Sequence, residues 1–270
     1  MRDRYAYLHT KLLILFSYSF LDVSLKDFRK IEEEYEWNKI LISQYFESSQ
    51  RMLVTIPTDA HVQLHLALYN KISRRLDLMG LADSWDSTGA VTCYSQGFRS
   101  GSGSGNGSAG SADSSMSPIG EEWRRFPTLM IDAGCSHSLS SMRAKAKWWF
   151  QISNHDIKIV LLAKLHESQQ MILLEKWEER QQEQVGEGEA EWVASCQQAI
   201  TISDTGVEPP VYRVTGGELV LDLKLLLLES PPQGDEFVVV TADDLQSYAI
   251  RVLERAVQGR YVPRGSTGSK

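Results

Sequence analysis

Two aspartates lie where a carboxylate is unexpected, and they are the residues of this sequence best suited to chemistry. Asp132 follows the apolar residues 129–131 in "RFPTLMIDAGCSHS", which has the pattern of a buried strand. Asp113 lies in "GSADSSMSP", where a glycine- and serine-rich tract gives way to a short extended segment before Pro118. Because an unpaired charge inside a protein is costly, each carboxylate is expected to have a partner.

A divalent cation would be such a partner. If the two segments pair as neighbouring strands, the carboxylates of Asp113 and Asp132 meet at one edge of the sheet. Close carboxylates repel each other unless a cation lies between them, and hard divalent ions prefer oxygen ligands. A Mg²⁺ site needs only one or two protein carboxylates, completed by waters and phosphate oxygens. The two aspartates are therefore sufficient in kind for a Mg²⁺ or Mn²⁺ site.

Two other groups of residues offer alternative sites: a pair of histidines, and a short run of serine and histidine. His61 and His65 stand four apart, on or near the apolar face of a predicted helix. As metal ligands they need a third group; otherwise they are histidines at the edge of the core. Ser136, His137 and Ser138 place hydroxyls beside an imidazole, but adjacent residues usually point apart and no Gly-x-Ser-x-Gly elbow is present. Capping of the following helix by Ser136 or Ser138 is favoured instead.

Composition sets the class of protein. The chain has 270 residues, 42% hydrophobic and 23% charged, which is typical of one large or two small globular domains. The net charge of −7 excludes an overall positive field, so binding to DNA or RNA would need local basic clusters. Three distant cysteines without a CxxC pair favour an intracellular location, nuclear or cytoplasmic. The apolar core of the N-terminal segment, residues 12–16, is too short for a membrane span.

Hydrophobic periodicity predicts the elements that position the two aspartates. Two helices have clear apolar stripes: residues 57–80, with Thr58 or Asp59 as N-cap, and residues 138–153. Strands are predicted at 128–134, 157–165 and 170–177, then at 211–214 and 219–229, with a final helix at 241–257. This order predicts an α/β protein with a mixed sheet and helices packed on it.

The sequence also predicts one main domain with an N-terminal extension and a C-terminal tail. We expect a helical N-terminal extension at residues 1–50, which could dock on the core or on a protein partner, and a single domain at 51–258. Within that domain, 98–112 is expected to be a flexible Gly/Ser loop and 178–190 an acidic loop. Residues 259–270 are expected to be a disordered tail.

The motifs together resemble a known family. "SADSSMSP", then "FPTLMIDAGCSHSLSSMRAKAKWWF", then "IKIVLLAKL" and "ILLEKW" resemble the PD-(D/E)XK nuclease superfamily, in particular a largely uncharacterised group of fungal proteins, over roughly residues 55–178. The resemblance implies a restriction-endonuclease-like mixed central sheet flanked by helices, with extra C-terminal strands and a terminal helix. It also implies that Asp113 and Asp132 hold Mg²⁺, which would activate a water for attack on a phosphodiester of DNA or RNA.

The sequence departs from this family at the motif lysine. Gly134 occupies the position two residues after the second aspartate. In related nucleases the cation can come from the following helix, which here offers Arg143, Lys145 and Lys147. Arg143 and Lys147 share one flank of that helix, whereas Lys145 lies on the other, and only one flank can face the carboxylates. Lys145 and Lys147 are the predicted catalytic cations, with Lys158 on the next strand as a further candidate.

These features support three hypotheses. The first is a Mg²⁺-dependent phosphodiesterase of the nuclease type. The second is a catalytically inactive protein with the same fold that serves as a binding or interaction module, favoured by Gly134, by the acidic net charge and by the flexible tract beside Asp113. The third is an unrelated α/β protein with two incidental aspartates.

Overall fold

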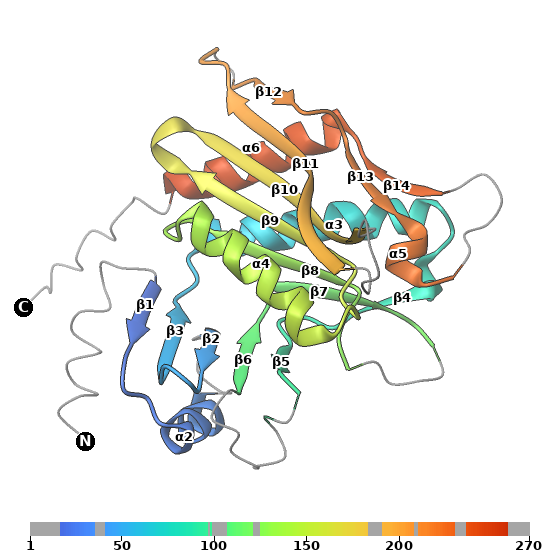
Figure 1. Ribbon diagram of the computed structural model, residues 1–270. Helices are drawn as coiled ribbons and strands as arrows, with labels where there is room; N and C mark the ends of the chain where they lie inside the picture. Colours follow the sequence, from blue (N-terminus) through green and yellow to red (C-terminus); the bar gives the residue numbers. More distant parts are fainter. Residues whose placement is uncertain are drawn as a thin grey trace, which may run out of the picture.

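The computed structural model describes residues 17–35, 41–96, 98, 107–120, 125–182, 191–207, 210–229 and 236–258. These residues form a seven-stranded sheet, a five-stranded sheet and a two-stranded sheet of β13 and β14, together with the helices α2 to α6 (Figure 1). None of the described helices combines the length and the apolar character that crossing a membrane requires. The predicted tail at 259–270 lies outside the described residues.

The seven-stranded sheet contains the strand with the second aspartate. Its order is β12-β11-β10-β9-β8-β7-β4. The bounds are β4 Trp85–Ser87, β7 Ser114–Pro118, β8 Leu129–Gly134, β9 Ile159–His166, β10 Met171–Gln182, β11 Glu191–Asp204 and β12 Tyr212–Thr215. All neighbouring strands are antiparallel except β8 and β9, which are parallel. Parallel neighbours need a crossover connection, and helix α4, Leu139–Ser153, provides it.

Helices cover both faces of this sheet, so the predicted mixed α/β architecture is confirmed. Helices α3 (Asp59–Leu78) and α6 (Ala242–Gln258) lie on one face and α4 on the other (Figure 1). Every residue of β8 is buried, which explains its continuous apolar run. The predicted cap of α3 is also present, because the Thr58 hydroxyl accepts a hydrogen bond from the backbone N–H of His61.

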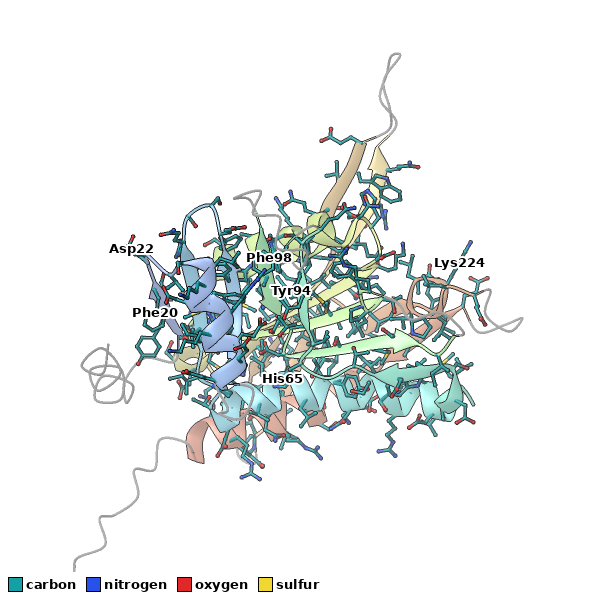
Figure 2. All side chains as sticks on the ribbon, turned by 90° about the horizontal axis from the view of Figure 1, so that it is seen from below. Phe20, Asp22, His65, Tyr94, Phe98 and Lys224 are labelled. Atoms are coloured by element: carbon teal, nitrogen blue, oxygen red, sulfur yellow. The ribbon has the colours of Figure 1, made fainter. Side chains whose placement is uncertain are left out.

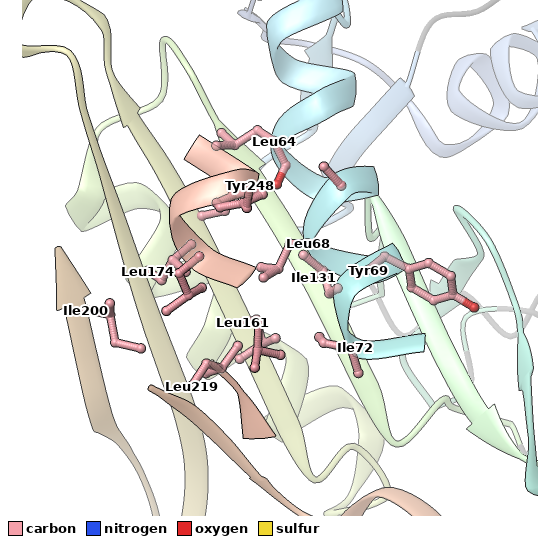
Figure 3. Close-up of a cluster of buried hydrophobic side chains, with 14 of the residues drawn as sticks. Leu64, Leu68, Tyr69, Ile72, Ile131, Leu161, Leu174, Ile200, Leu219 and Tyr248 are labelled. Atoms are coloured by element: carbon pink, nitrogen blue, oxygen red, sulfur yellow. Dashed lines mark hydrogen bonds between the residues drawn. The ribbon is translucent and has the colours of Figure 1, made fainter. Parts of the chain in front are cut away.

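The main hydrophobic core lies between the sheet and the α3–α6 pair. Figure 3 shows side chains of α3, of strands β8 to β11 and β13, and of α6 in one cluster. Its fully buried members include Leu64, Leu68, Ile72, Ile131 and Leu161. Burying each such side chain contributes about 1.5–3 kcal/mol, so this cluster fixes α3 against β8.

The five-stranded sheet lies beside α4 and has the order β1-β3-β2-β6-β5 (Figure 1). Its bounds are β1 Ser17–Phe20, β2 Leu41–Phe46, β3 Arg51–Thr55, β5 Thr92–Tyr94 and β6 Ser108–Ser111. Helix α2, Leu25–Tyr35, packs on it through Phe28, which stacks on Tyr45 at 4.2 Å between ring centroids. Phe98 and Tyr94 lie beside this helix (Figure 2).

The expected helical extension at residues 1–50 is wrong for the described part of that range. Only residues 25–35 are helical, whereas β1 and β2 are strands of the five-stranded sheet. The apolar spacing of three to four continues through residues 41–46, but β2 pairs there with both β3 and β6 and buries Tyr45 completely. Pairing with distant strands outweighs local helical periodicity.

Three further boundaries need correction. Within 98–112, residues 108–111 form the buried strand β6, which pairs with β2 and β5 and whose Gly110 allows Trp148 to approach closely. Within 178–190, β10 continues to Gln182 through pairing with β11, and 183–190 lie outside the described residues. Residues 219–229 contain β13, Leu219–Asp222, followed by the short helix α5, Leu223–Leu227. The strand ends there because the Asp222 carboxylate caps the helix, accepting from the Lys224 N–H at 2.8 Å.

Candidate functional site

The chain passes from the five-stranded to the seven-stranded sheet at Asp113. Strand β6 ends at Ser111 and β7 begins at Ser114. The backbone N–H of Asp113 donates to the carbonyl of Ile131 at 3.1 Å, which continues the β7–β8 ladder by one residue. The two acidic segments are therefore neighbours, and Asp113 and Asp132 line the same cavity.

The Asp132 carboxylate is buried and has a partner at each oxygen. The ammonium of Lys145 donates to Oδ1 at 2.7 Å, and the indole N–H of Trp149 donates to Oδ2 at 2.7 Å. Asp132 is 3% exposed, so it needs both partners. The helix α4 therefore provides the groups that allow a carboxylate inside this sheet.

Lys145 also joins the two sheets. Besides Asp132, its ammonium donates to the carbonyl of Ser111 at 2.7 Å and to the hydroxyl of Ser43 at 3.4 Å. Ser111 ends β6 and Ser43 lies on β2, and both strands belong to the five-stranded sheet. Lys145 itself is buried. Its three hydrogen bonds fix the cation at the junction between the sheets.

The other predicted cations lie elsewhere. Lys147 is exposed, and its ammonium lies 5.9 Å from the centroid of the Trp177 ring. Arg143 pairs with both carboxylate oxygens of Glu175 on β10. The ammonium of Lys158 donates to the carbonyl of His155. Of the four candidates, Lys145 is the one that contacts a predicted site aspartate; Lys147 does not.

Asp113 is held differently from Asp132. Its Oδ2 accepts a hydrogen bond from the backbone N–H of Ala133 at 2.7 Å and lies 3.6 Å from Nε2 of His61. Burial raises the pKa of the Asp113 carboxyl to about 6, and repulsion by Asp132 adds to this rise while Lys145 opposes it. Asp113 is thus a carboxylate whose negative charge is poorly compensated.

Three histidines surround this pair of aspartates. Burial lowers the pKa of His61 to about 4 and that of His137 to about 4, and the positive charge of Lys145 adds to both shifts. Burial also lowers the pKa of His65, whose Nδ1 lies 2.8 Å from the Ser114 hydroxyl. The three imidazoles are therefore neutral at pH 7, and Lys145 carries the positive charge of the cluster.

A small cavity of about 20 Å³ opens between the two sheets at this place. Asp113, Asp132 and Lys145 line it from one side, and Thr55 of β3 lines it from the other. His137, before the first turn of α4, lies on its wall as well. A space of this size admits a water molecule or a single small ion.

The packing around Gly134 concerns the position where the sequence resemblance expects a lysine. Position 134 lies on the same strand face as Asp132, toward α4. A Cβ atom at Gly134 would lie 2.4 Å from Sδ of Met142, closer than real Cβ contacts. The end of the buried Met142 side chain would therefore have to shift to admit a side chain here. Lys145 reaches the Asp132 carboxylate from α4 instead.

Replacing Gly134 by alanine is expected to destabilise the protein by about 1–3 kcal/mol, because Met142 is buried and must shift. Denaturant unfolding of Gly134→Ala, of Met142→Ala and of the double variant Gly134→Ala/Met142→Ala measures the coupling energy between the two positions. The double variant should lose less stability than the two single variants add up to. Strict additivity would contradict the predicted clash.

Sequence reasoning assigned several of these residues only in part. Ser138 is the N-cap of α4, as one of the two favoured alternatives, and its hydroxyl accepts from the Ser141 N–H. Trp149 fits the apolar stripe of its helix, and the sequence gives no sign that its N–H donates to Asp132. His61 and His137 were not expected beside the aspartates. The sequence places His61 in the first turn of a capped helix, but it does not show that His61 lies beside Asp113, 52 residues later.

Comparisons with known proteins give a fold-level likeness and no family. No protein-family model and no curated protein matches the chain. Among solved structures, it is similar to the crystal structure of "a putative nuclease belonging to DUF820" from Anabaena variabilis, at 12% identity and a TM-score of 0.43. The alignment covers 84% of this chain and 99% of that one.

The described residues contain no group of three or more His, Cys, Asp or Glu side chains that could hold a metal ion. A divalent ion here would have to be held by one or two protein ligands and completed by waters and substrate oxygens. Two buried carboxylates stand beside one lysine, and the pKa of Asp113 is raised. The unbalanced negative charge and the cavity between the sheets fit a cation at Asp113.

Proposed function

We propose that this protein is a divalent-metal-dependent phosphodiesterase of the nuclease type, a member of the PD-(D/E)XK superfamily, that acts on nucleic acid. The observation that carries the proposal is the convergence of Asp113, Asp132 and Lys145 on one buried cavity, with Lys145 2.7 Å from Asp132. These are two acids and a lysine, the set that the sequence resemblance implies, although the lysine comes from α4.

Each residue of this set has a distinct role in the proposed reaction. The Ala133 N–H orients the carboxylate of Asp113, and the Trp149 N–H orients that of Asp132. The ammonium of Lys145 would stabilise negative charge that develops on the phosphate during attack by water. A cation fixed by three hydrogen bonds needs little reorganisation for this task.

Asp113 and Asp132 are the residues that would hold the ion, Mg²⁺ or Mn²⁺. Once bound, such an ion would polarise the phosphate and lower the pKa of a coordinated water. Asp132 can contribute only through lone pairs not used by Lys145 and Trp149, whereas Asp113 carries the less compensated charge.

Cleavage assays with the purified full chain test this proposal. Labelled single- and double-stranded DNA and RNA are incubated with Mg²⁺ or Mn²⁺, and cleavage is expected with one of them. Asp113→Asn and Asp132→Asn should each reduce cleavage to background. Asp83→Asn, at an exposed carboxylate far along the chain from β8, is the matched control and should retain activity. Cleavage that survives both site substitutions would rule out this metal site.

A catalytically inactive binding module is the second candidate, and one observation favours it. The cavity is small and is closed on one side by Ser43 and Thr55 of the five-stranded sheet, so a nucleotide would not enter it as it stands. The buried ion pair of Lys145 and Asp132 would then serve to join the two sheets. Absence of cleavage on all four substrates with either ion would favour this candidate.

A further inference from the structure

The charges around the cavity do not balance. Two carboxylates, Asp113 and Asp132, are buried beside Lys145, and the lysine donates to Asp132. Within the described part of the chain, the basic side chain within 4 Å of Asp113 is His61. Asp113 therefore has neither a lysine nor an arginine as an ion-pair partner among the described residues. The surroundings of Asp113 therefore leave a place for a cation.

The position of His61 relative to Asp113 is unusual. The imidazole Nε2 lies 3.6 Å from Oδ2 of Asp113, which is too long for a hydrogen bond. The two side chains are only 5% and 6% exposed, so this gap lies inside the protein. The other ring nitrogen, Nδ1, is buried without a hydrogen-bond partner.

The separation fits two ligands of one ion. Bonds from a transition metal to an imidazole nitrogen and to a carboxylate oxygen are each about 2.0–2.2 Å long. Two such bonds span 3.6 Å with an open angle at the ion, whereas a direct contact at that distance contributes little. Helix α3 holds His61 in place, since the first turn is capped by Thr58 and the helix packs on β8.

We propose that His61 and Asp113 together bind the divalent ion, and that the site therefore prefers Mn²⁺ to Mg²⁺. This rests on the proposed function only in placing an ion at Asp113. An imidazole nitrogen favours first-row transition ions, whereas Mg²⁺ favours oxygen ligands. Waters and substrate oxygens complete the shell, and Asp132 remains chiefly the partner of Lys145.

Mn²⁺ binding to the full chain tests the proposal without any nuclease assay. Isothermal titration calorimetry gives the affinities for Mn²⁺ and Mg²⁺, and pulsed electron paramagnetic resonance detects nitrogen coupled to bound Mn²⁺. We expect tighter binding of Mn²⁺ than of Mg²⁺ and a nitrogen coupling that changes when the histidines are labelled with ¹⁵N. In His61→Ala the coupling should disappear and Mn²⁺ affinity should fall by about tenfold or more.

The matched control is His65→Ala. His65 lies one turn further along α3 (Figure 2), with its ring 5.6 Å from that of His61, but its Nδ1 contacts Ser114 rather than Asp113. This variant should keep both the affinity and the coupling. His61→Gln, closer in size, replaces His61→Ala if the alanine variant unfolds, and the coupling in the wild type requires no variant.

Each result decides one of the two proposals. Mn²⁺ bound without nitrogen coupling, equal affinity in the His61 variants, tighter binding of Mg²⁺, or no Mn²⁺ binding at all would overturn the role of His61. Histidine-coupled Mn²⁺ without cleavage of any nucleic acid would support the metal site and contradict the nuclease. Cleavage with Mg²⁺ and no coupled nitrogen would support the nuclease and contradict the role of His61 as a metal ligand.

Discussion

Replacing Lys145 by methionine is expected to destabilise the protein by about 3–5 kcal/mol. The substitution keeps the length of the side chain but leaves Asp132 as an uncompensated charge in a buried site, 3% exposed. It also leaves the carbonyl of Ser111 without its donor at 2.7 Å. Denaturant unfolding followed by circular dichroism at pH 7 measures the loss. Under the proposed function, cleavage should be lost as well.

Lys147→Met is the matched control, since it removes a positive charge from the same helix two residues away. Lys147 is exposed, so the change in unfolding free energy should stay within about 0.5 kcal/mol. The double variant Lys145→Met/Asp132→Asn should recover part of the lost stability, because no buried charge then remains unpaired. Equal losses in the two single lysine variants would show that Lys145 and Asp132 are not coupled.

The sequence alone does not determine which of these lysines contacts the aspartates. A helical wheel separates Lys145 from Arg143 and Lys147, but it does not say which flank of the helix faces the carboxylates. That is decided by how α4 packs on the sheet, with Ala146, Trp149 and Phe150 all buried there. Docking of this kind depends on contacts with β9, formed by a later part of the chain.

The local elements, by contrast, follow from the sequence. Strand β8, the crossover helix α4 and strand β9 lie where periodicity and capping place them, because each buries an apolar face set by its own residues. The pairing of β7 with β8 meets the condition under which Asp113 and Asp132 come together. The five-stranded sheet does not, since β2 is held by β3 and by β6, which lies more than 60 residues later. Such pairing leaves little local signal.

The residues of the site likewise fall into those that the sequence indicates and those that it does not. Asp113 and Asp132 could be found because a charge next to an apolar run is unusual. His61 and Trp149 could not, since each also fits the pattern of an ordinary helix residue. Their contacts with the aspartates arise where α3 and α4 approach β8 from opposite faces.

Asp113→Asn is expected to stabilise the metal-free protein at pH 8 by up to about 3 kcal/mol. Burial raises the pKa of Asp113 to about 6 in the folded state, above its ordinary value of 3.8. Folding therefore favours the protonated form. The stability that this group contributes is fully present below pH 3.8 and is lost as the pH rises through 6. Asparagine has no charge to bury, and its carbonyl can still accept from the Ala133 N–H.

Denaturant unfolding of both proteins in chelator from pH 4 to pH 8 measures this difference. The difference in unfolding free energy between the variant and the wild type should grow between pH 4 and pH 6 and stay constant above pH 6. A difference that does not depend on pH would contradict the buried charge. His61 and His137, whose pKa values are lowered to about 4, destabilise both proteins alike as the pH falls below 6.5. Added Mn²⁺ should then narrow the difference at pH 8, because an ion that binds only the folded wild type stabilises it. The carboxylate that costs most stability without the ion is the one that would bind it.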